Sequence, residues 1–222
     1  AYSTILKSNK KILHKTVAEV IEENFNDKIE IFYFDLALHY DISENSEKAI
    51  TYLMLAGIKN YFIFDYTQSK LCFERIIKII ENDTDLNNAS ESIINDYYKS
   101  KLYLAKISLS TGEWNESLEI LKSIKCKDEK LNKTLLYDIH YTFGEVYSMK
   151  REHEIAILNF KKALHISKEL NDKIKEGSTI GELAHIAFQL GQNDAALKGF
   201  NKELELFKAS NSSLKLPIAY GH

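Results

Sequence analysis

The sequence has few residues that end helices and few that form cross-links. Its 222 residues include one proline, eight glycines and two cysteines. So little proline and glycine leaves few forced helix ends, which favours consecutive helices with short connections. Cys72 and Cys126 show no CxxC spacing. This argues against a disulfide framework and favours a reducing compartment, so we expect a cytoplasmic protein.

Long apolar runs and an excess of one charge are also missing. No run approaches the roughly 20 residues of a membrane-spanning helix, and no signal-peptide pattern opens the chain. The 29 basic and 32 acidic residues give a net charge of −3 and a pI near 6.2. Nucleic-acid binders normally carry a basic excess. We therefore expect a partner that is neither nucleic acid nor membrane.

One pattern of small and large residues occurs twice. The first copy lies in YTFGEVYSMKREHEIAILNFKKAL and contains Phe143, Gly144, Tyr147, Ala156, Phe160 and Ala163. The second copy, forty residues later, contains Leu183, Ala184, Ala187, Ala196 and Phe200. Small residues let two helix backbones approach closely, and large ones fill the space beside them. Such repetition is typical of a helical-hairpin solenoid, which presents a surface for binding.

Helical periodicity extends over the rest of the chain. We predict ten helices, over residues 3–24, 29–42, 47–61, 66–80, about 91–109, 114–125, 131–149, 153–169, 175–190 and 194–208. Ser46 is the expected N-cap of the third helix. No stretch alternates with period two, so we expect no strand. The polar segment NDTDLNNAS at 82–90 is the clearest gap, but the same pattern on both sides favours one continuous array.

The repeated pattern resembles the tetratricopeptide repeat (TPR), whose unit is about 34 residues long. Two further copies contain Leu104, Ala105, Ser117, Leu121 and Ile124, and Leu36, Ala37, Tyr40, Ala49, Leu53 and Ala56. The longer spacing resembles the variants found in kinesin light chain and in large signalling regulators. The resemblance implies an all-α, right-handed superhelix of antiparallel helical hairpins over residues 28–210. Residues 211–222 would begin a further, truncated repeat.

The N-terminal third carries a second resemblance, through AYSTILKSNKKILHKTVAEVIEENF, LALHY, SEKAITYLMLAGIKN and FDYTQSKLCFERIIKII. It is similar to the segment after the ATPase module in large bacterial signal-transduction ATPases, many of which are linked to adenylate or guanylate cyclases or protein kinases. The resemblance implies that residues 1–27 are a linking helix at the end of a winged-helix region. The chain begins at Ala1 without Met, and we expect it to be a piece of a longer protein.

Catalytic motifs are absent from the sequence. It contains no phosphate-binding loop, no GxSxG and no HExxH, and the paired acids Asp83 and Asp85 lack the glycine and distal glutamate of an EF-hand loop. We predict no catalytic residue, no metal and no cofactor. His14 and His39 are expected to be hydrogen-bond donors between helices, and Cys72 a buried structural thiol. The catalytic activity of the larger protein stays open.

The TPR resemblance also implies a concave groove lined by the first helix of each repeat. Carried onto these copies, the predicted peptide contacts are Lys99, Leu102, Lys106, Asp138, Tyr141, Glu145, Met149, His185 and Phe188, with Leu109, Ser110, Ser148, Ser178, Gly181 and Gln189 beside them. The set lacks the paired Lys and Asn that clamp a C-terminal carboxylate in some family members. It favours an extended or helical peptide held by aromatic and Met contacts.

Together these features predict a non-catalytic protein- or peptide-binding module that is the regulatory or sensor arm of a larger signalling ATPase or cyclase. A ligand in the groove would shift the population of curvatures, and the first helix would pass the change to the attached module. Two alternatives stay open: a self-association scaffold and a free-standing peptide receptor of the quorum-sensing type. The groove could also be a plain solvated surface, or could pack against the parent protein's own domains.

Overall fold

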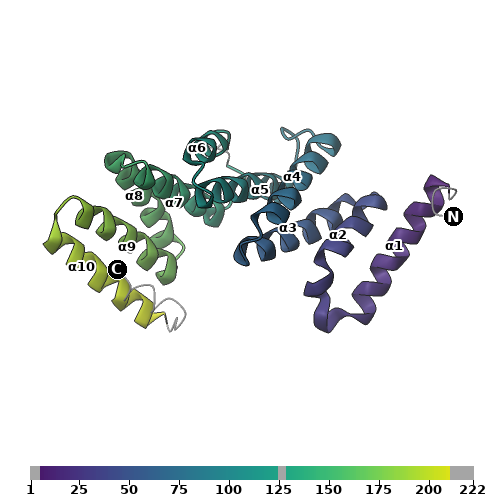
Figure 1. Ribbon diagram of the computed structural model, residues 1–222, viewed down its shortest axis with the longest axis horizontal. Coiled ribbons are helices and arrows are strands. Elements are labelled where there is room, and N and C mark those ends of the chain that lie inside the picture. The colour runs from purple at the N-terminus through teal and green to yellow at the C-terminus, as the bar shows by residue number, and fades with distance from the viewer. Residues whose placement is uncertain (1–5, 125–128, 211–222) are drawn as a thin grey trace. The chain divides into compact units, whose positions relative to one another are not determined.

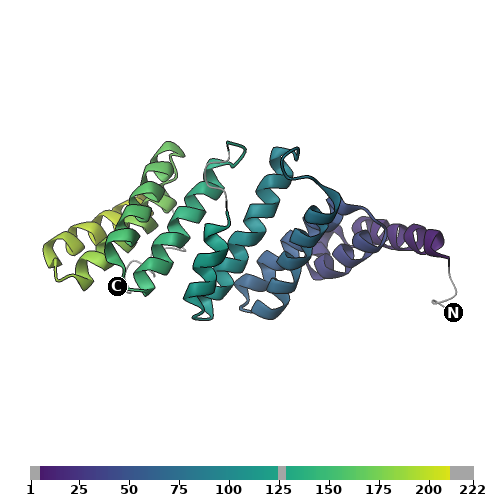
Figure 2. The same ribbon diagram turned by 90° about the horizontal axis from the view of Figure 1, so that it is seen from above.

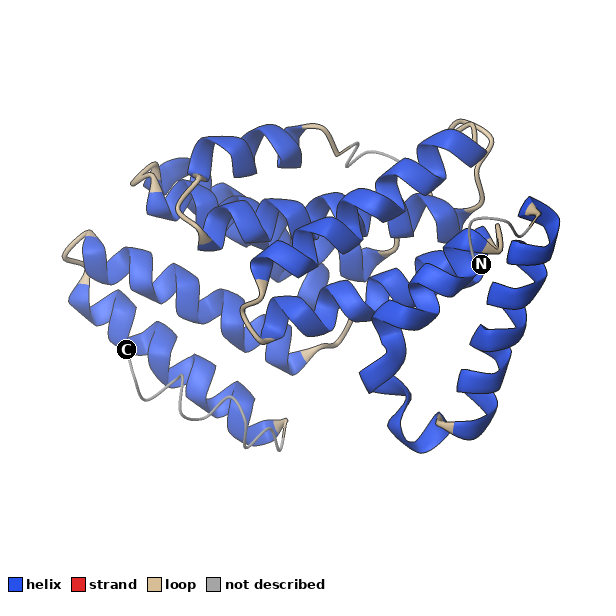
Figure 3. Cartoon of the chain, turned by 45° about the vertical axis from the view of Figure 1, so that its right-hand side comes forward, coloured by secondary structure: helices blue, strands red, loops and turns tan. Residues whose placement is uncertain are grey.

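The computed structural model describes residues 6–124 and 129–210, and this part of the chain consists of helices joined by turns and loops, with no strand (Figure 3). It contains α1 (Lys7–Asn24), the 3₁₀ helix η2 (Asn26–Phe32), α2 (Tyr33–Ile42), α3 (Ser46–Phe62), α4 (Tyr66–Asp83), α5 (Glu91–Ser110), α6 (Trp114–Lys122), α7 (Lys133–Met149), α8 (His153–Glu169), α9 (Lys173–Gln189) and α10 (Asn193–Ala209). The predicted all-α class is confirmed.

The predicted helix ends lie within a few residues of the observed ones, except near residue 28. There the predicted helix 29–42 divides after Phe32, whose dihedral angles (φ −102°, ψ 6°) are not α-helical, so its first residues belong to η2 and the rest to α2. Lys28 (φ −134°, ψ 23°) adds a kink within η2. The first residues of the predicted helix 3–24, the last residue of 114–125 and the predicted repeat at 211–222 lie outside the described residues.

Side-chain caps fix several helix starts. Asn45, Asp65, Asn132 and Asp172 each accept a hydrogen bond from a backbone N–H in the first turn of the helix that follows. The prediction that Ser46 caps α3 is wrong, because Asn45 occupies that place one residue earlier. The Ser46 hydroxyl instead donates to Asp83 Oδ2 at 2.6 Å and joins the start of α3 to the end of α4.

Six connections between helices share one geometry. Each has three residues, and the middle one has a φ between 52° and 84°: Glu44, Phe64, Gly112, Arg151, Asn171 and Gly191. The next residue donates its N–H to the carbonyl five positions back, as Glu152 does to Tyr147 at 2.9 Å. The middle residue donates to the carbonyl three positions back, as Arg151 does to Ser148. This is the Schellman ending, which satisfies the last carbonyls of a helix and reverses the chain.

Small residues allow the helices of a hairpin to approach closely, as predicted. A Cβ added to Gly144 on α7 would lie 2.5 Å from the Phe160 ring on α8. Ala156, Ala184 and Ala196 are each less than 5% exposed. Gly57 on α3 and Phe73 on α4 repeat the contact at 2.8 Å and at the same sequence spacing of 16 residues. The small residues therefore face the adjoining helix rather than water.

The next hairpin reaches the same closeness with the small residue moved to its second helix. Ala184 on α9 occupies the place of Gly144, and Gly199 on α10 occupies the place of the buried Asn159 on α8. A Cβ on Gly199 would lie 2.6 Å from the Cβ of Ala184. The methyl group of Ala184 on α9 is thus accommodated because Gly199 on α10 has no side chain.

The chain divides into two compact units, Ala1–Ile107 and Ser108–His222, with the boundary inside α5. In the first unit α1 packs on α2, α2 on α3, and α3 on α4. In the second unit α7 packs on α8, α8 on α9, and α9 on α10, and the last two lie side by side in Figures 1 and 2.

The predicted domain boundaries and the handedness of the superhelix stay predictions. None of the described helices is long and apolar enough to cross a membrane.

Candidate functional site

In the second unit, two helices that begin consecutive repeats, α7 and α9, are held together by a polar network. Lys175 Nζ donates to Asp138 Oδ1 at 2.8 Å, and the same ammonium lies 4.2 Å from the centre of the Tyr137 ring. The Tyr137 hydroxyl donates to the Lys175 carbonyl at 3.0 Å and lies 2.9 Å from Thr179 Oγ1. Asp138, a predicted peptide contact, therefore already has a cationic partner.

Tyr141, another predicted contact, is part of the same packing. Its ring stacks on Tyr137 with centroids 5.6 Å apart and meets Phe160 edge-on at 5.5 Å. Its hydroxyl lies 3.4 Å from Glu182 Oε1 on α9. Burial raises the pKa of the Tyr141 phenol well above its ordinary value, so the ring contributes an uncharged, packed surface.

Other predicted contacts in the second unit remain accessible. Met149 and Phe188 lie at the C-terminal ends of α7 and α9 and are 57% and 61% exposed. Glu145 and His185, one turn earlier on each helix, are half-buried. These four side chains offer apolar contact area beside polar groups, and their role in binding stays a prediction.

Two of the predicted contacts are placed wrongly. Leu102 is 1% exposed and belongs to the core. Gly181 is buried against α10, where a Cβ would lie 2.4 Å from Glu203 Oε1. Lys99 and Lys106 on α5 are half-buried, and the Lys106 ammonium lies 5.6 Å from the centre of the Tyr103 ring. The repeat register predicts inner-face positions, but it does not predict which of those positions a neighbouring helix covers.

An exposed apolar surface that the sequence analysis missed lies at the turn between α3 and α4. Phe62, Ile63 and Phe64 are 68%, 61% and 77% exposed. The Tyr61 ring packs against Phe62 and Tyr66 with centroids 5.6 and 5.7 Å apart. We call Tyr61, Phe62, Ile63, Phe64 and Tyr66 the aromatic turn. The run of four large apolar residues at a predicted helix end was the available signal.

Phe64 also has an unusual backbone. Its φ of 63° lies in the left-handed region, which bulky side chains rarely adopt. A glycine fills the same position in the turns at Gly112 and Gly191. The aromatic turn thus keeps a large, exposed ring where glycine would be less strained.

The first helix is attached through one carboxylate. Glu22 on α1 accepts hydrogen bonds from Tyr40 at 2.7 Å, from Lys48 at 2.7 Å and from Tyr52 at 2.6 Å. Burial raises the pKa of Glu22, but these three hydrogen bonds outweigh it and hold the pKa below its ordinary value. The carboxylate therefore stays charged near neutral pH and ties α1 to α2 and α3.

Two histidines form a second contact between α1 and α2. His14 Nδ1 lies 2.6 Å from His39 Nδ1, and the ring centroids are 4.9 Å apart. The predicted hydrogen bond between helices is confirmed, but both rings cannot be donors, because one of the two facing nitrogens must accept. Burial, and then the charge of His14, lowers the pKa of His39, which favours the neutral ring.

The other face of α1 is apolar and uncovered. Ala18 is fully buried, whereas Ile12, Leu13 and Val20 are 66%, 46% and 48% exposed. A helix with apolar residues on two faces has one face left for another contact.

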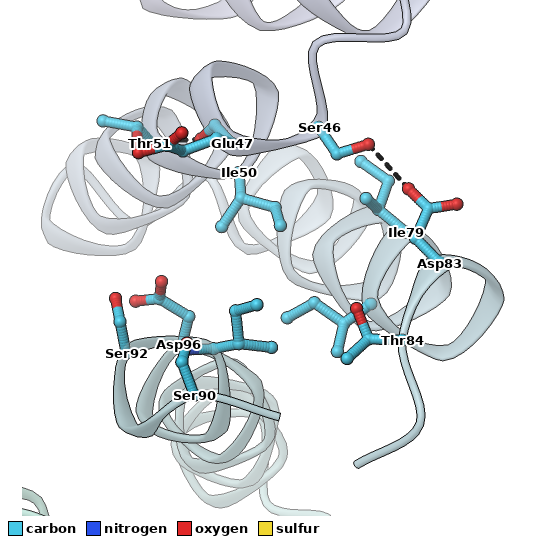
Figure 4. Close-up of a pocket in the computed structure, with 12 residues that line it drawn as sticks. Ser46, Glu47, Ile50, Thr51, Ile79, Asp83, Thr84, Ser90, Ser92 and Asp96 are labelled. Atoms are coloured by element: carbon cyan, nitrogen blue, oxygen red, sulfur yellow. Dashed lines mark hydrogen bonds between the residues drawn. The ribbon is translucent and has the colours of Figure 1, made fainter. Parts of the chain in front are cut away.

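A cavity of about 320 Å³ lies in the first unit among the start of α3, the end of α4 and the start of α5 (Figure 4). Its lining residues are Ser46, Glu47, Ile50, Thr51, Ile79, Ile80, Asp83, Thr84, Ser90, Ser92, Ile93 and Asp96. Isoleucines form its floor, and hydroxyls and carboxylates form its rim. We call it the acidic cavity. No sequence pattern predicts this cavity, because its lining comes from three separate segments.

Cys72 occupies a structural position in the core. Cys72 is 1% exposed, and burial raises the pKa of its thiol to about 11, which confirms the predicted buried thiol. Within residues 6–124 and 129–210, no group of three His, Cys, Asp or Glu side chains is placed to hold a metal ion.

Comparison with known proteins gives structural but not sequence neighbours. No family model matches the chain. No curated protein matches it. Among solved structures, apo RapI gives a TM-score of 0.66 at 17% identity and covers 90% of this chain and 71% of its own. A putative kinesin light chain with nearly identical TPR-like repeats, from Podosopora anserina, gives 0.60 at 13% identity and covers 93% and 98%.

A third neighbour is larger than this chain. It is a signal transduction ATPase with numerous domains, with a tetratricopeptide repeat sensor, from Pyrococcus horikoshii. The TM-score is 0.51 at 16% identity, and the match covers 94% of this chain but 37% of the other. At these identities the likeness concerns the fold alone. The chain is an all-α, TPR-like solenoid.

Proposed function

We propose that this chain is a non-catalytic, TPR-like module that binds a protein or a peptide, and that it is the regulatory or sensor arm of a larger signalling ATPase or cyclase in the cytoplasm. The solenoid fold supports the binding role, since stacked helical hairpins provide extended surfaces. The likeness to a signal transduction ATPase with a tetratricopeptide repeat sensor supports the wider setting.

The observation that carries the binding role is the exposure of the aromatic turn. Covering a side chain such as Phe62 or Phe64 contributes about 1.5–3 kcal/mol when it leaves water fully. Clusters of exposed apolar side chains are typical of contact surfaces.

The attachment of α1 supports a regulatory arm. Glu22 ties one face of the helix to α2 and α3, while Ile12, Leu13 and Val20 on the other face remain exposed. A neighbouring module that covers this second face would share α1 with the repeat array. Ligand binding to the array would then shift the populations in which α1 is docked or released.

The binding role is tested by selection from a random peptide display library on the immobilised 222-residue chain. We expect selected peptides to bind with micromolar dissociation constants in fluorescence anisotropy. A Phe62→Ser/Phe64→Gly variant should weaken the binding of peptides that contact the aromatic turn at least tenfold. Leu71→Ser, at a residue 51% exposed on α4, is the matched control and should leave binding unchanged. A chain that selects no peptide would contradict the proposed role.

The regulatory role needs the longer protein. Hydrogen exchange of the ATPase- or cyclase-linked parent, with and without a selected peptide, should show altered protection in α1. Unchanged exchange in α1 would count against the relay while leaving peptide binding intact.

Self-association is the second candidate, and the aromatic turn favours it too, because two copies could cover each other's exposed rings. Sedimentation equilibrium separates the two functions. A dimer that depends on concentration and is lost in Phe62→Ser/Phe64→Gly would support the scaffold, whereas a monomer at all concentrations would support a peptide ligand. The free-standing peptide receptor would be favoured by a coding sequence without an upstream ATPase module.

A further inference from the structure

The acidic cavity is separate from the aromatic turn, although both involve α3. Glu47 and Ile50 line the cavity at the first turn of α3, and Phe62 is the last residue of the helix. At 1.5 Å per residue, the two ends lie roughly 22 Å apart. The cavity is therefore a second site, and its chemistry can be considered by itself.

The floor of the cavity is apolar and well packed. Ile50, Ile79 and Ile80 are 9%, 5% and 1% exposed, and Ile93 is half-buried. Ile50 from α3 and Asp96 from α5 point into the hollow from opposite sides (Figure 4). The volume of about 320 Å³ is at the small end of the range for ligand sites, about 300–1,000 Å³. It suits one long side chain.

The rim carries charge of one sign. Glu47, Asp83 and Asp96 are acidic, and no Lys or Arg is among the lining residues, although the chain as a whole has 29 basic against 32 acidic residues. Two basic groups act on the rim from outside. Burial raises the pKa of Asp96, and the charge of Lys99 offsets only part of that increase. Arg75 is held by two hydrogen bonds to Asp41, at 2.7 and 2.8 Å.

Helix ends do not reverse this sign. α3 and α5 both begin at the cavity, and each N-terminus contributes roughly half a positive charge. Three carboxylates outweigh that total. Some of the backbone N–H groups at these helix starts are also already hydrogen-bonded. The Lys48 N–H donates to Asn45 Oδ1 at 3.2 Å, and the Ile93 N–H donates to Ser90 Oγ at 3.4 Å. An anion is therefore disfavoured.

A bare metal ion does not suit the rim either. The carboxylates come from three helices, and no group of three placed to hold a metal ion occurs in the part of the chain that the structure describes. Asp83 Oδ2 already accepts from the Ser46 hydroxyl at 2.6 Å. The spread of the negative charge around an apolar floor calls for a cation that carries an apolar body.

We propose that the acidic cavity binds a lysine or arginine side chain of the protein or peptide ligand. The methylene stem would lie on the isoleucine floor, and the charged head would be held among Glu47, Asp83 and Asp96 by charge-assisted hydrogen bonds. This inference rests on the protein-binding function proposed above, and it specifies the chemistry of one anchor residue of that ligand.

The test is an NMR titration of the isotope-labelled 222-residue chain with three capped heptapeptides, GSGKGSG and its counterparts with norleucine or glutamate in the centre. The lysine peptide should shift the amide signals of residues 46–51, 79–84 and 90–96, and it should bind at least threefold more tightly than the norleucine peptide. The glutamate peptide should bind more weakly than either. Equal binding of the lysine and norleucine peptides, or shifts confined to other helices, would overturn the proposal.

Isosteric variants keep the test independent of folding. Glu47→Gln/Asp96→Asn should weaken the lysine peptide about tenfold and leave the norleucine peptide unchanged. Asp83→Asn retains an acceptor for Ser46 and should weaken the lysine peptide alone. The matched control is Glu119→Gln on α6, an exposed carboxylate of the second unit, which should change nothing. Loss of the lysine preference in the control as well would also overturn the proposal.

The two proposals fail separately. If the display library yields ligands whose binding is unaffected by Glu47→Gln/Asp96→Asn and by replacement of their basic residues, the cavity proposal fails and the binding function stands. If the library yields no ligand but the lysine heptapeptide still binds at the cavity, the binding surface proposed at the aromatic turn fails and the cavity chemistry stands.

Discussion

Replacing Gly144 by alanine should destabilise the second unit, although alanine is the better helix former. In an exposed helix this change gains about 1 kcal/mol. Here the new Cβ would lie 2.5–2.7 Å from three atoms of the Phe160 ring, against an optimum of roughly 3.5–4.0 Å between carbon atoms. The ring is fully buried and meets Tyr141 edge-on at 5.5 Å, so it cannot move away freely.

The magnitude follows from two opposing contributions. Forcing a methyl group into a packed core costs about 1–3 kcal/mol, and the helix propensity returns about 1 kcal/mol. We expect a net loss of up to about 2 kcal/mol in the free energy of unfolding. For a chain of this length that lowers the melting temperature by up to roughly 8 °C.

Urea unfolding followed by the fluorescence of Trp114 measures the loss. Trp114 is the one tryptophan of the chain and lies on α6, in the same unit as Gly144. Phe160→Leu is the matched background, because it removes ring atoms that the new methyl group meets. In that background Gly144→Ala should be neutral or should stabilise by up to about 1 kcal/mol. Stabilisation of the unmodified chain by Gly144→Ala would refute the close-approach reasoning.

Three further predictions concern a turn and the attachment of α1. Arg151→Gly should stabilise the chain by up to about 1 kcal/mol in urea unfolding, because φ is 60° at this position and glycine adopts it without strain. Lys48→Met should accelerate hydrogen exchange in α1, because Glu22 loses its cationic donor at 2.7 Å; exchange unchanged relative to the unmodified chain would contradict this. The pKa of His39 is lowered in the fold, so the unfolded chain takes up a proton at this ring more readily than the folded chain. The contribution of the neutral His39 to the stability of the fold is therefore present above about pH 6.5 and is lost as the pH falls below it. Docking of α1 should therefore weaken between pH 7.5 and 5.5, after correction for intrinsic exchange, and replacement of His14 and His39 by Gln should remove that dependence.

The sequence was most informative where one residue had to be small. Gly144 and Ala156 have a direct steric role, so their spacing predicted both the hairpin and its helix boundaries. The same logic applies to Gly57 and Phe73, which share the spacing of Gly144 and Phe160. The hairpin of α3 and α4 was not predicted, because α3 also fits the pattern of the second helix in a hairpin with α2. In the structure α3 packs on both α2 and α4.

The candidate sites were less predictable, because their partners lie on other helices. The TPR resemblance predicts Asp138 on the inner face of α7, but only the fold reveals Lys175 on α9 as its partner. Leu102 fits the inner-face register and is nevertheless buried. The acidic cavity depends on how far α4 continues past residue 80, and the prediction ended that helix three residues before Asp83.

The six identical Schellman turns make the length of the array difficult to alter one residue at a time. One residue inserted into such a turn would rotate the following helix by about 100° and carry its apolar stripe away from the neighbour. Tolerated insertions should instead fall in the longer connection at residues 84–90, outside those turns. Engineering or divergence of this scaffold should therefore exchange whole helical pairs and keep the three-residue turns at their present length.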